Sequence, residues 1–229
     1  MMGKSERFFN AGYKVPKYQL PLGKRSVFHE SLLTFKRYFK SIPFIFIVRA
    51  DFGARQFVSE ELVSLGVLDF RIIEIGKDTS GQAETAIIGT RDYSDNQDLI
   101  IFNIDTIRRN FLMPDAVEYG DGFLEVFLGD GEQWSFVEPG LNNQVKSTTE
   151  KDRISDLCSN GMYGFKRLGD LRDAYKHSNH DELVVNNEIY IAPLYNFLIK
   201  AGKNIKYRIV STSLIENIGT PEEYKRLIE

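Results

Sequence analysis

The chain has 229 residues, of which 42% are hydrophobic and 13% aromatic, and it carries a formal net charge of −3. This length and composition support one sizeable α/β domain, and the mildly acidic balance argues against DNA or RNA as a partner. The single cysteine, Cys158, excludes an intramolecular disulfide, and the longest apolar run, Ile42–Val48, is too short to span a bilayer.

The first half of the chain alternates between helical and strand patterns. Large apolar side chains recur at helical spacing from residue 27 to residue 39, and a continuous apolar run then indicates a strand buried on both faces. The patterns predict helices at Val27–Phe39, Arg55–Leu65 and Gln82–Ile88, and strands at Phe44–Val48, Phe70–Ile75 and Leu99–Phe102. Alternation of this kind implies right-handed crossovers and a mostly parallel sheet.

The second half has shorter strands that follow one another closely in sequence. Gly-rich and Asn-rich turns, such as Gly129-Asp130-Gly131 and Leu141-Asn142-Asn143, separate them. The predicted strands are Phe123–Phe127, Trp134–Val137, Val145–Thr149, Met162–Phe165 and Ile205–Val210, and the predicted helices are Leu168–His177, Ile189–Ala201 and one that begins at Pro221. Such spacing indicates a mixed, partly antiparallel region.

Together these patterns predict a single α/β domain over residues 1–229, with a Rossmann-like, mostly parallel central sheet and helices on both faces. Residues 1–115 form the expected nucleotide-binding half, and residues 116–229 form a mixed half that covers it. In open α/β sheets, ligands bind at the carboxyl ends of the strands, so the chemistry is expected there.

The opening 25 residues contain glycines, prolines and basic residues but no apolar run. They therefore lack the core of a signal peptide, and we expect a cytoplasmic protein that contacts no membrane. Gly3 lets backbone N–H groups approach a phosphate, Arg7 can bind phosphate oxygens bidentately, and Lys17 can face a triphosphate. A flexible, charged N-terminus would contain the same residues, so this segment alone leaves both interpretations open.

Two further candidates stand next to predicted elements. Gln82 opens a helix after Gly81, where its amide can read the edge of a base. Asp105 follows the apolar strand Leu99–Phe102 in the segment Asn103-Ile104-Asp105, where a carboxylate is well placed to hold Mg²⁺ against phosphates. An ordinary helix start and a turn aspartate are the alternatives.

Lys151 and Asn160 are the candidates of the second half. Lys151 follows a strand and can neutralise a substrate phosphate, and Asn160 leads into a strand and can bond a hydroxyl. Surface roles are the alternative for both. The three histidines and the single cysteine form no pattern of a triad or a zinc site, and Trp134, Tyr190 and Tyr195 are expected to be packing residues.

The order of these segments resembles that of the sugar-phosphate nucleotidyltransferase family. The run MGKSERFFNAGYKVPKYQLPLGK is similar to the opening of its members, where a Gly-rich loop ending in Arg precedes a Pro-Lys pair. Gly81-Gln82-Ala83, Asn103-Ile104-Asp105, Glu150-Lys151, the strand 161–165 and the run 218–224 follow in the family's order. The resemblance spans nearly the whole chain. It is strongest with the bacterial branch that acts in capsule and surface-polysaccharide synthesis.

The resemblance implies a metal-dependent enzyme that transfers a nucleoside monophosphate from a nucleoside triphosphate to a sugar 1-phosphate or similar small phosphate ester, releasing pyrophosphate. It implies that residues 116–229 bind this acceptor and that Mg²⁺ is the cofactor. The implied site comprises Gly3, Lys4, Ser5, Arg7 and Gln82 for the nucleotide, Lys17 by the α-phosphate, Asp105 for the metal, and Lys151 and Asn160 for the acceptor. No protein nucleophile is needed, because such catalysis consists of positioning and charge neutralisation.

Three features depart from the family pattern. Ser5 stands where a second glycine is usual, and Asn217 stands where a second metal-binding aspartate is common. The strand that normally precedes the Gly-rich loop is missing, and we expect that native residues upstream of Met1 supply it. These departures leave two alternatives, a glycosyltransferase that uses a nucleotide-sugar and a degenerate relative that binds a nucleotide without turnover.

Overall fold

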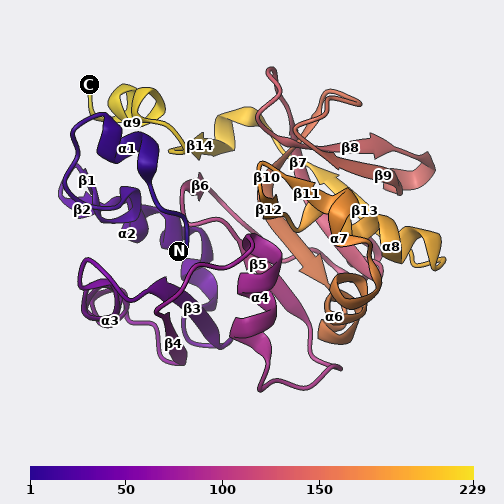
Figure 1. Ribbon diagram of the computed structural model, residues 1–229, viewed down its shortest axis with the longest axis horizontal. Coiled ribbons are helices and arrows are strands. Elements are labelled where there is room, and N and C mark those ends of the chain that lie inside the picture. The colour runs from indigo at the N-terminus through magenta and orange to yellow at the C-terminus, as the bar shows by residue number, and fades with distance from the viewer. The chain divides into compact units, whose positions relative to one another are not determined.

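The computed structural model describes residues 1–229 apart from the side chain of Glu182, and its contacts divide the chain into two compact units (Figure 1). Unit 1 comprises Met1–Asp78, Ile104–Phe111 and Ser213–Glu229, and unit 2 comprises Thr79–Asn103 and Leu112–Thr212. The expected halves, 1–115 and 116–229, concern what each part binds, and they stay a prediction.

Unit 1 contains short elements around one parallel strand pair. Its helices are α1 (Glu6–Asn10), α2 (Val27–Leu32), α3 (Ala54–Leu65) and α9 (Pro221–Ile228), and its strands are β1 (Pro21–Leu22), β2 (Arg25–Ser26), β3 (Phe44–Arg49), β4 (Phe70–Ile75), β6 (Thr106–Arg108) and β14 (Ile215–Asn217). Strands β3 and β4 pair in parallel, and α3 forms the crossover between them. Helix α3 ends at Gly66, whose φ of 72° is the left-handed conformation common at helix ends. The predictions for β3, α3 and β4 are confirmed.

The predicted helix 27–39 is two elements. Helix α2 ends at Leu32, and a 3-10 helix follows over Leu33–Tyr38 with a kink at Phe35. The expected apolar face is nevertheless buried, as Phe28, Leu32, Phe35 and Phe39 show.

The core of unit 1 joins distant parts of the chain. One buried cluster contains Phe8, Leu20, Val27, Ile107, Ile218 and Tyr224. Helix α9 begins at Pro221 as predicted, and Thr220 and Glu223 form a capping box there. Strand β14 pairs antiparallel with β6, which brings the 215–217 segment beside the residues that follow Asp105.

Unit 2 is built on a six-stranded sheet in which β13, β7, β10, β8 and β9 are neighbours in that order and β5 also pairs with β10. Its strands are β5 (Leu99–Phe102), β7 (Gly122–Leu128), β8 (Ser135–Pro139), β9 (Val145–Glu150), β10 (Leu157–Phe165), β11 (Val184–Val185), β12 (Glu188–Ile189) and β13 (Ile205–Ile209). Its helices are α4 (Gln82–Thr90), α5 (Ala116–Tyr119), α6 (Leu168–His177), α7 (His180–Leu183) and α8 (Tyr195–Lys200). The α/β class is confirmed, with mixed pairing: β13 runs parallel to β7, whereas β5, expected as a further parallel strand, is antiparallel to β10.

The long strand β10 carries an irregularity that matters for the site. It begins at Leu157, five residues before the predicted start. Ser159 pairs with Val126 of β7, but the next residue of β10 that pairs with β7 is Tyr163, which faces Leu124. The segment between them therefore forms a bulge opposite the single residue Glu125.

The predicted helix Ile189–Ala201 is wrong in its first half. Ile189 ends β12, and its N–H donates to Ser80 O at 2.7 Å instead of entering a helical turn. Pro193 lacks an N–H group and lies in a 3-10 helix, so the α-helix begins only at Tyr195. In the part of the chain that the structure describes, no helix is long and apolar enough to cross a membrane.

Candidate functional site

A lysine and an aspartate that stand 88 residues apart in sequence meet in unit 1. Lys17 begins a short 3-10 helix, Asp105 directly precedes β6, and Lys17 Nζ donates to Asp105 Oδ2 at 2.5 Å. Burial alone would raise the pKa of the Asp105 carboxyl, but the charge and the hydrogen bond of Lys17 hold that pKa below its ordinary value. Asp105 is therefore ionised and paired at neutral pH.

The predicted phosphate-binding segment is tied to Lys17 through Ser5. Ser5 Oγ accepts the backbone N–H of Lys17 at 3.2 Å, and Ser5 itself has a φ of 54°. A glycine here would adopt this left-handed conformation with less strain, and the serine side chain supplies the bond to Lys17 instead. Gly3 is exposed, and a Cβ built on it would meet nothing within 4 Å.

The other basic residues of the segment lie at the surface. Lys4 pairs with Asp78 at 2.9 Å, and Arg49 reaches the same carboxylate at 2.5 Å. Arg49, and after it Lys4, lower the pKa of Asp78. Arg7 lies on α1 with its side chain exposed. Unit 1 thus brings Lys17 and Asp105 together, ties Ser5 to them, and leaves Arg7 open to solvent.

Asn217 also lies beside this pair, within the same unit. It stands opposite Thr106 in the register of β14 and β6, and Thr106 Oγ1 donates to Asn217 Oδ1 at 3.4 Å. Ile218 N–H donates to the backbone oxygen of Asp105 at 2.8 Å. A Cβ built on Gly219 would lie 3.9 Å from Asp105 Oδ2, so the carboxylate faces the turn after β14.

The donors at this turn are of the kind that Mg²⁺ prefers, and such an ion would take most of its ligands from substrate and water. Asp105 offers a carboxylate and Asn217 an amide oxygen, both hard donors. Among the residues that the structure describes, no three or more His, Cys, Asp or Glu side chains cluster as a metal cage. Mg²⁺ usually binds proteins through one or two side chains plus phosphates, whereas a dedicated cage is typical of other ions.

In unit 2, Gln82 does not stand free at the start of α4. Its Nε2 donates to Asn103 Oδ1 at 2.6 Å. Gly81, which precedes it, has a φ of 128°, and a Cβ there would lie 2.6 Å from the backbone N of Ile189. Glycine is required at this position because β12 approaches the start of α4 so closely.

Lys151 is held by an aromatic residue that the sequence did not single out for chemistry. Its Nζ donates to the hydroxyl of Tyr190 at 2.7 Å and lies 4.5 Å from the centre of that ring. The backbone of Lys151 has a φ of 56°, a strained value for a lysine, so the surrounding structure fixes its position. Nothing in the spacing of Tyr190 distinguishes it from a packing residue.

Next to Lys151, the Glu150 carboxyl is buried. Ser135 Oγ donates to Glu150, the hydroxyls of Ser135 and Tyr163 are 3.2 Å apart, and Lys151 Nζ stands 4.0 Å from Glu150 Oε1. Burial raises the pKa of Glu150, against the hydrogen bond from Ser135 and the charge of Lys151. This group can therefore accept a hydrogen bond or hold a proton.

Asn160, the other predicted acceptor contact, is 2% exposed, and both atoms of its amide are engaged inside unit 2. Its Nδ2 donates to Glu125 Oε1 at 2.7 Å, and its Oδ1 accepts the N–H of Met162 at 3.1 Å. Contact between Asn160 and an acceptor stays a prediction. Glu125 was missed by sequence reasoning, although a glutamate inside the apolar stretch FLEVF is a signal that it needs a buried partner.

A Ser-His-Glu group in unit 1 lacks the geometry of a nucleophilic site. His29 Nδ1 lies 2.7 Å from Glu61 Oε2, but Ser26 Oγ donates to Glu61 at 2.5 Å rather than to the imidazole. Ser26 Oγ also accepts the N–H of His29 and caps α2. A base that cannot take the serine proton cannot activate it, so no chemistry is assigned to this group.

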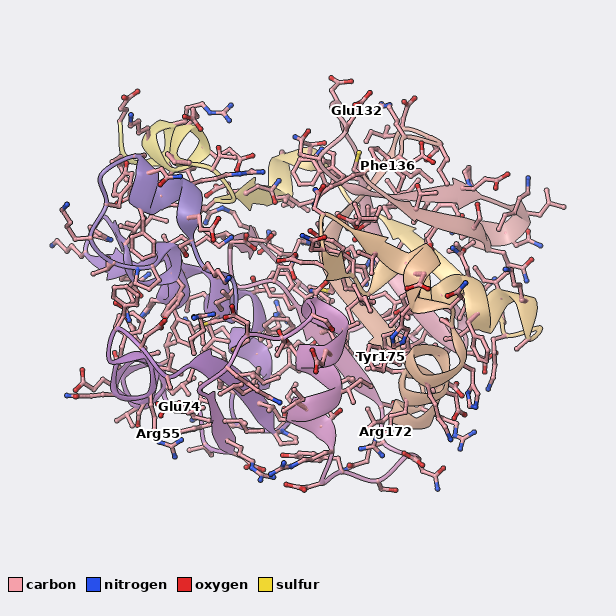
Figure 2. All side chains as sticks on the ribbon, in the orientation of Figure 1. Arg55, Glu74, Glu132, Phe136, Arg172 and Tyr175 are labelled. Atoms are coloured by element: carbon pink, nitrogen blue, oxygen red, sulfur yellow. The ribbon has the colours of Figure 1, made fainter. Side chains whose placement is uncertain are left out.

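An open cavity of about 630 Å³ lies beside the start of α3 in unit 1. Arg55 of α3 and Glu74 of β4 both line it (Figure 2). None of the predicted site residues is among its described lining residues. The polar contacts around Lys17 and Asp105, rather than this cavity, mark the candidate site of unit 1.

No protein-family model matches the chain, and no curated protein matches it either. The solved nucleoside-diphosphate-sugar pyrophosphorylase from Vibrio cholerae RC9 is 41% identical, with a TM-score of 0.92 and coverage of 99% of this chain and 96% of that chain. A putative glucose-1-phosphate thymidylyltransferase from Bacillus anthracis is 16% identical, with a TM-score of 0.75 and coverage of 98% and 90%. The inositol-1-phosphate CTP transferase from T. maritima is 15% identical, with a TM-score of 0.73 and coverage of 98% and 91%. The last two share the fold.

Proposed function

Because this chain belongs to the sugar-phosphate nucleotidyltransferase family, we propose that it joins a nucleoside monophosphate to a sugar 1-phosphate or a similar small phosphate ester. The donor is a nucleoside triphosphate and the second product is pyrophosphate. Nucleotidyltransferase activity follows from the family. The need for Mg²⁺ and a place in the synthesis of capsule or surface-polysaccharide precursors are parts of the proposal.

The observation that carries the proposal is the pairing of Lys17 with Asp105 in unit 1. An oxygen of the acceptor phosphate attacks the α-phosphorus in line, a new P–O bond forms, and the bond to the departing pyrophosphate breaks. Two anions approach each other in this step, so the protein must supply positive charge in a fixed place. Lys17 supplies it, and Asp105 and Ser5 fix the side chain and the backbone of Lys17.

The triphosphate would be bound by the segment that precedes Lys17. We assign its β- and γ-phosphates to Arg7 and to the backbone N–H groups of Gly3, Lys4 and Ser5. The guanidinium of Arg7 is exposed and hence accessible to an anion. The side chain of Lys4 is also exposed and can leave Asp78 for a phosphate, since a surface ion pair contributes only about 0–1 kcal/mol.

Asp105 and Asn217 would hold the magnesium ion. The two residues come from neighbouring segments of unit 1, at the same end of the β6–β14 pair. When bound, Mg²⁺ neutralises charge on the phosphate oxygens. An amide is a weaker ligand than a carboxylate, so Asp105 is expected to provide most of the affinity that the protein contributes.

Residues of unit 2 would serve the base and the acceptor. Gln82 would read the base with its amide, and Lys151 would meet the phosphate of the acceptor. Tyr190 orients the ammonium group of Lys151 without cancelling its charge, which leaves that charge available for an anion. Glu150 would accept or donate a hydrogen bond to a hydroxyl of the acceptor.

The test is pyrophosphate release by the purified full chain. The protein is incubated with CTP, UTP, GTP, ATP or dTTP, with Mg²⁺ and a panel of sugar 1-phosphates, and pyrophosphate and nucleotide-sugar are quantified. We expect equimolar products with at least one pair and none after chelation by EDTA. No release with any pair, together with sugar transfer from a ready nucleotide-sugar, would overturn the proposal in favour of a glycosyltransferase.

A matched pair of lysine variants ties the activity to the site. Lys17→Ala removes the ammonium group held by Asp105 and should lower kcat about 100-fold, as the loss of one transition-state donor does elsewhere. Lys24→Ala removes an exposed lysine of the same segment and should leave kcat unchanged. Equal rates for the two variants would remove Lys17 from the site.

A further inference from the structure

A series of polar contacts in unit 2 leads from a fully buried carboxylate to the amide of Gln82. We propose that Glu125, to which no substrate contact is assigned, is a positioning residue for Gln82. The contacts run in order through Asn160, Gly161 and Asn103. The inference rests on the proposed function in one respect, namely that Gln82 contacts the nucleotide.

The first step is the pair of Glu125 and Asn160. Glu125 lies on β7 and is 0% exposed, and its Oε1 accepts Asn160 Nδ2 at 2.7 Å. Its other oxygen is 3.7 Å from Arg208 Nε. A buried carboxylate without partners is strongly destabilising, so the folded state holds the Asn160 amide in this orientation.

The second step is the bulge of β10. On the β7 side, the segment 160–162 faces Glu125 alone and makes no regular ladder, whereas on the β5 side Met162 pairs with Phe102. Side chains bond the N–H groups of this segment: Asn160 Oδ1 accepts the N–H of Met162 at 3.1 Å, and Ser159 Oγ accepts the N–H of Gly161 at 3.2 Å. Glu125 thereby acts on the shape of the segment around Gly161 through the side chain of Asn160, alongside the bond from Ser159.

The third step is the contact of Gly161 with Asn103. Gly161 has a φ of 83°, and a Cβ there would lie 2.3 Å from Asn103 Nδ2. Its carbonyl oxygen also accepts the backbone N–H of Asn103 at 3.2 Å. The Asn103 side chain thus lies directly against the bulge, at a distance that only glycine permits.

The last step joins Asn103 to Gln82. Gln82 Nε2 donates to Asn103 Oδ1 at 2.6 Å, which commits one N–H of the Gln82 amide to the protein and fixes the orientation of that amide. A free glutamine can turn its amide either way, whereas this one is held so that its oxygen and its second N–H are available to a ligand. The geometry therefore fixes the direction from which a nucleotide group can pair with this amide, and a base edge that offers a donor beside an acceptor would match it.

The experiment compares two substitutions of the buried carboxylate. Glu125→Met removes the acceptor oxygens at similar size, whereas Glu125→Gln keeps one oxygen for Asn160. Glu125→Met should raise KM for the triphosphate about 3- to 30-fold, in the range seen for residues along coupled networks. Glu125→Gln should stay near the wild-type KM, and Glu138→Met, at a partly exposed glutamate of β8, is the matched control.

Two readouts separate positioning from general loss of stability. Gln82→Met should raise KM at least as much as Glu125→Met does, and the double variant should lose no more than Gln82→Met alone. In the ligand-free protein, the side-chain amide resonance of Gln82 should shift in Glu125→Met and stay in place in Glu125→Gln. That NMR readout needs no turnover.

Each outcome decides a separate point. A Glu125→Met protein with a lower Tm but an unchanged Gln82 resonance and KM, or losses that add in the double variant, would overturn the positioning role. If Glu125→Met does not fold, Gly161→Ala takes its place. Its methyl group displaces Asn103 while Glu125 and Asn160 stay paired. A Gln82 resonance that does not shift in Gly161→Ala would likewise overturn the positioning role. A wild-type chain without turnover refutes the proposed function, whereas the resonance tests the contact series by itself.

Discussion

In unit 1, the ion pair of Lys17 and Asp105 leaves 24% and 22% of the two side chains exposed. In unit 2, Glu125 and Asn160 are 0% and 2% exposed and satisfy each other. Water and ligands reach the first pair, so its charges can act on a bound anion directly. The second pair cannot exchange partners without leaving a buried group unpaired, so it acts by fixing the shape of the segments around it.

The largest expected effect tests the more exposed pair, Lys17 and Asp105. Asp105→Ala removes the carboxylate that positions Lys17 and is assigned to the metal, so kcat should fall about 100- to 1,000-fold. Steady-state pyrophosphate release measures it, and circular dichroism checks the fold. Asp69→Ala, at an exposed acid of unit 1, is the control. Undiminished turnover in Asp105→Ala would take this residue out of the reaction.

Arg7→Ala should have a smaller effect, confined to one substrate. The exposed guanidinium is assigned to the triphosphate, and its loss should raise KM for the triphosphate about tenfold while leaving KM for the acceptor unchanged. Arg37→Ala, at another exposed arginine of unit 1, is the control. If KM for the acceptor rises instead, Arg7 contacts the acceptor rather than the triphosphate.

The bounds of helices and strands could be predicted most accurately where the local sequence pattern agrees with burial in the fold. The strand at Phe44 and the helix that follows it were predicted almost to the residue, because continuous apolar runs and helical spacing decide both. The helix expected at Ile189 failed, because a long-range bond from its N–H to Ser80 competes with helical pairing. Tertiary contacts of this kind leave no periodic signal in the sequence.

The candidate site divides in the same way. Asp105 and Lys17 were predicted as neighbours of phosphate from their places after a strand and a proline, and the structure brings their charges together. Their roles stay predictions. Tyr190 could not be predicted, because its partner Lys151 is distant in sequence and aromatic residues usually pack. For Glu125, the sequence indicates only that an acid inside an apolar strand needs a buried partner, and it does not identify Asn160 as that partner.

The stability contributed by the Asp105 carboxyl of unit 1 and by the Glu150 carboxyl of unit 2 should change with pH in opposite directions. The pKa of Asp105 is lowered from 3.8, so the stability that it contributes is present above that value and lost as pH falls through the lowered pKa. The pKa of Glu150 is raised from 4.5, so its contribution is full below 4.5 and lost as pH rises through the raised pKa. One group stabilises as an anion and the other as an acid.

Matched amide variants measure this contrast. Near pH 7, Asp105→Asn should lower Tm and Glu150→Gln should raise it, and both differences from wild type should shrink as pH falls below the ordinary pKa values of 3.8 and 4.5. Thermal unfolding from about pH 2 to about pH 7.5 is the measurement, because the contribution of Asp105 is lost only below its ordinary pKa of 3.8. A rise in Tm for both variants at neutral pH would mean that burial dominates both carboxyls, and a fall for both would mean that the partner charges do.

The smallest effect concerns how each unit holds its lysine. Lys17 donates directly to a carboxylate, whereas Lys151 donates to the neutral phenol of Tyr190, with Glu150 4.0 Å away. Tyr190→Phe keeps the ring face and removes one hydrogen bond, so KM for the acceptor should rise only about two- to threefold.

Tyr175→Phe, elsewhere in unit 2, is the matched control for this substitution, and KM for the triphosphate should be unchanged in both variants. Tyr190→Ala, which also removes the ring face, should weaken acceptor binding further than Tyr190→Phe. If Tyr190→Phe alone lowers acceptor binding as much as Lys151→Ala does, the phenol does more than orient the ammonium group. The hydroxyl would then contact the acceptor itself, and the lysine of unit 2 would depend on its partner as strictly as Lys17 depends on Asp105.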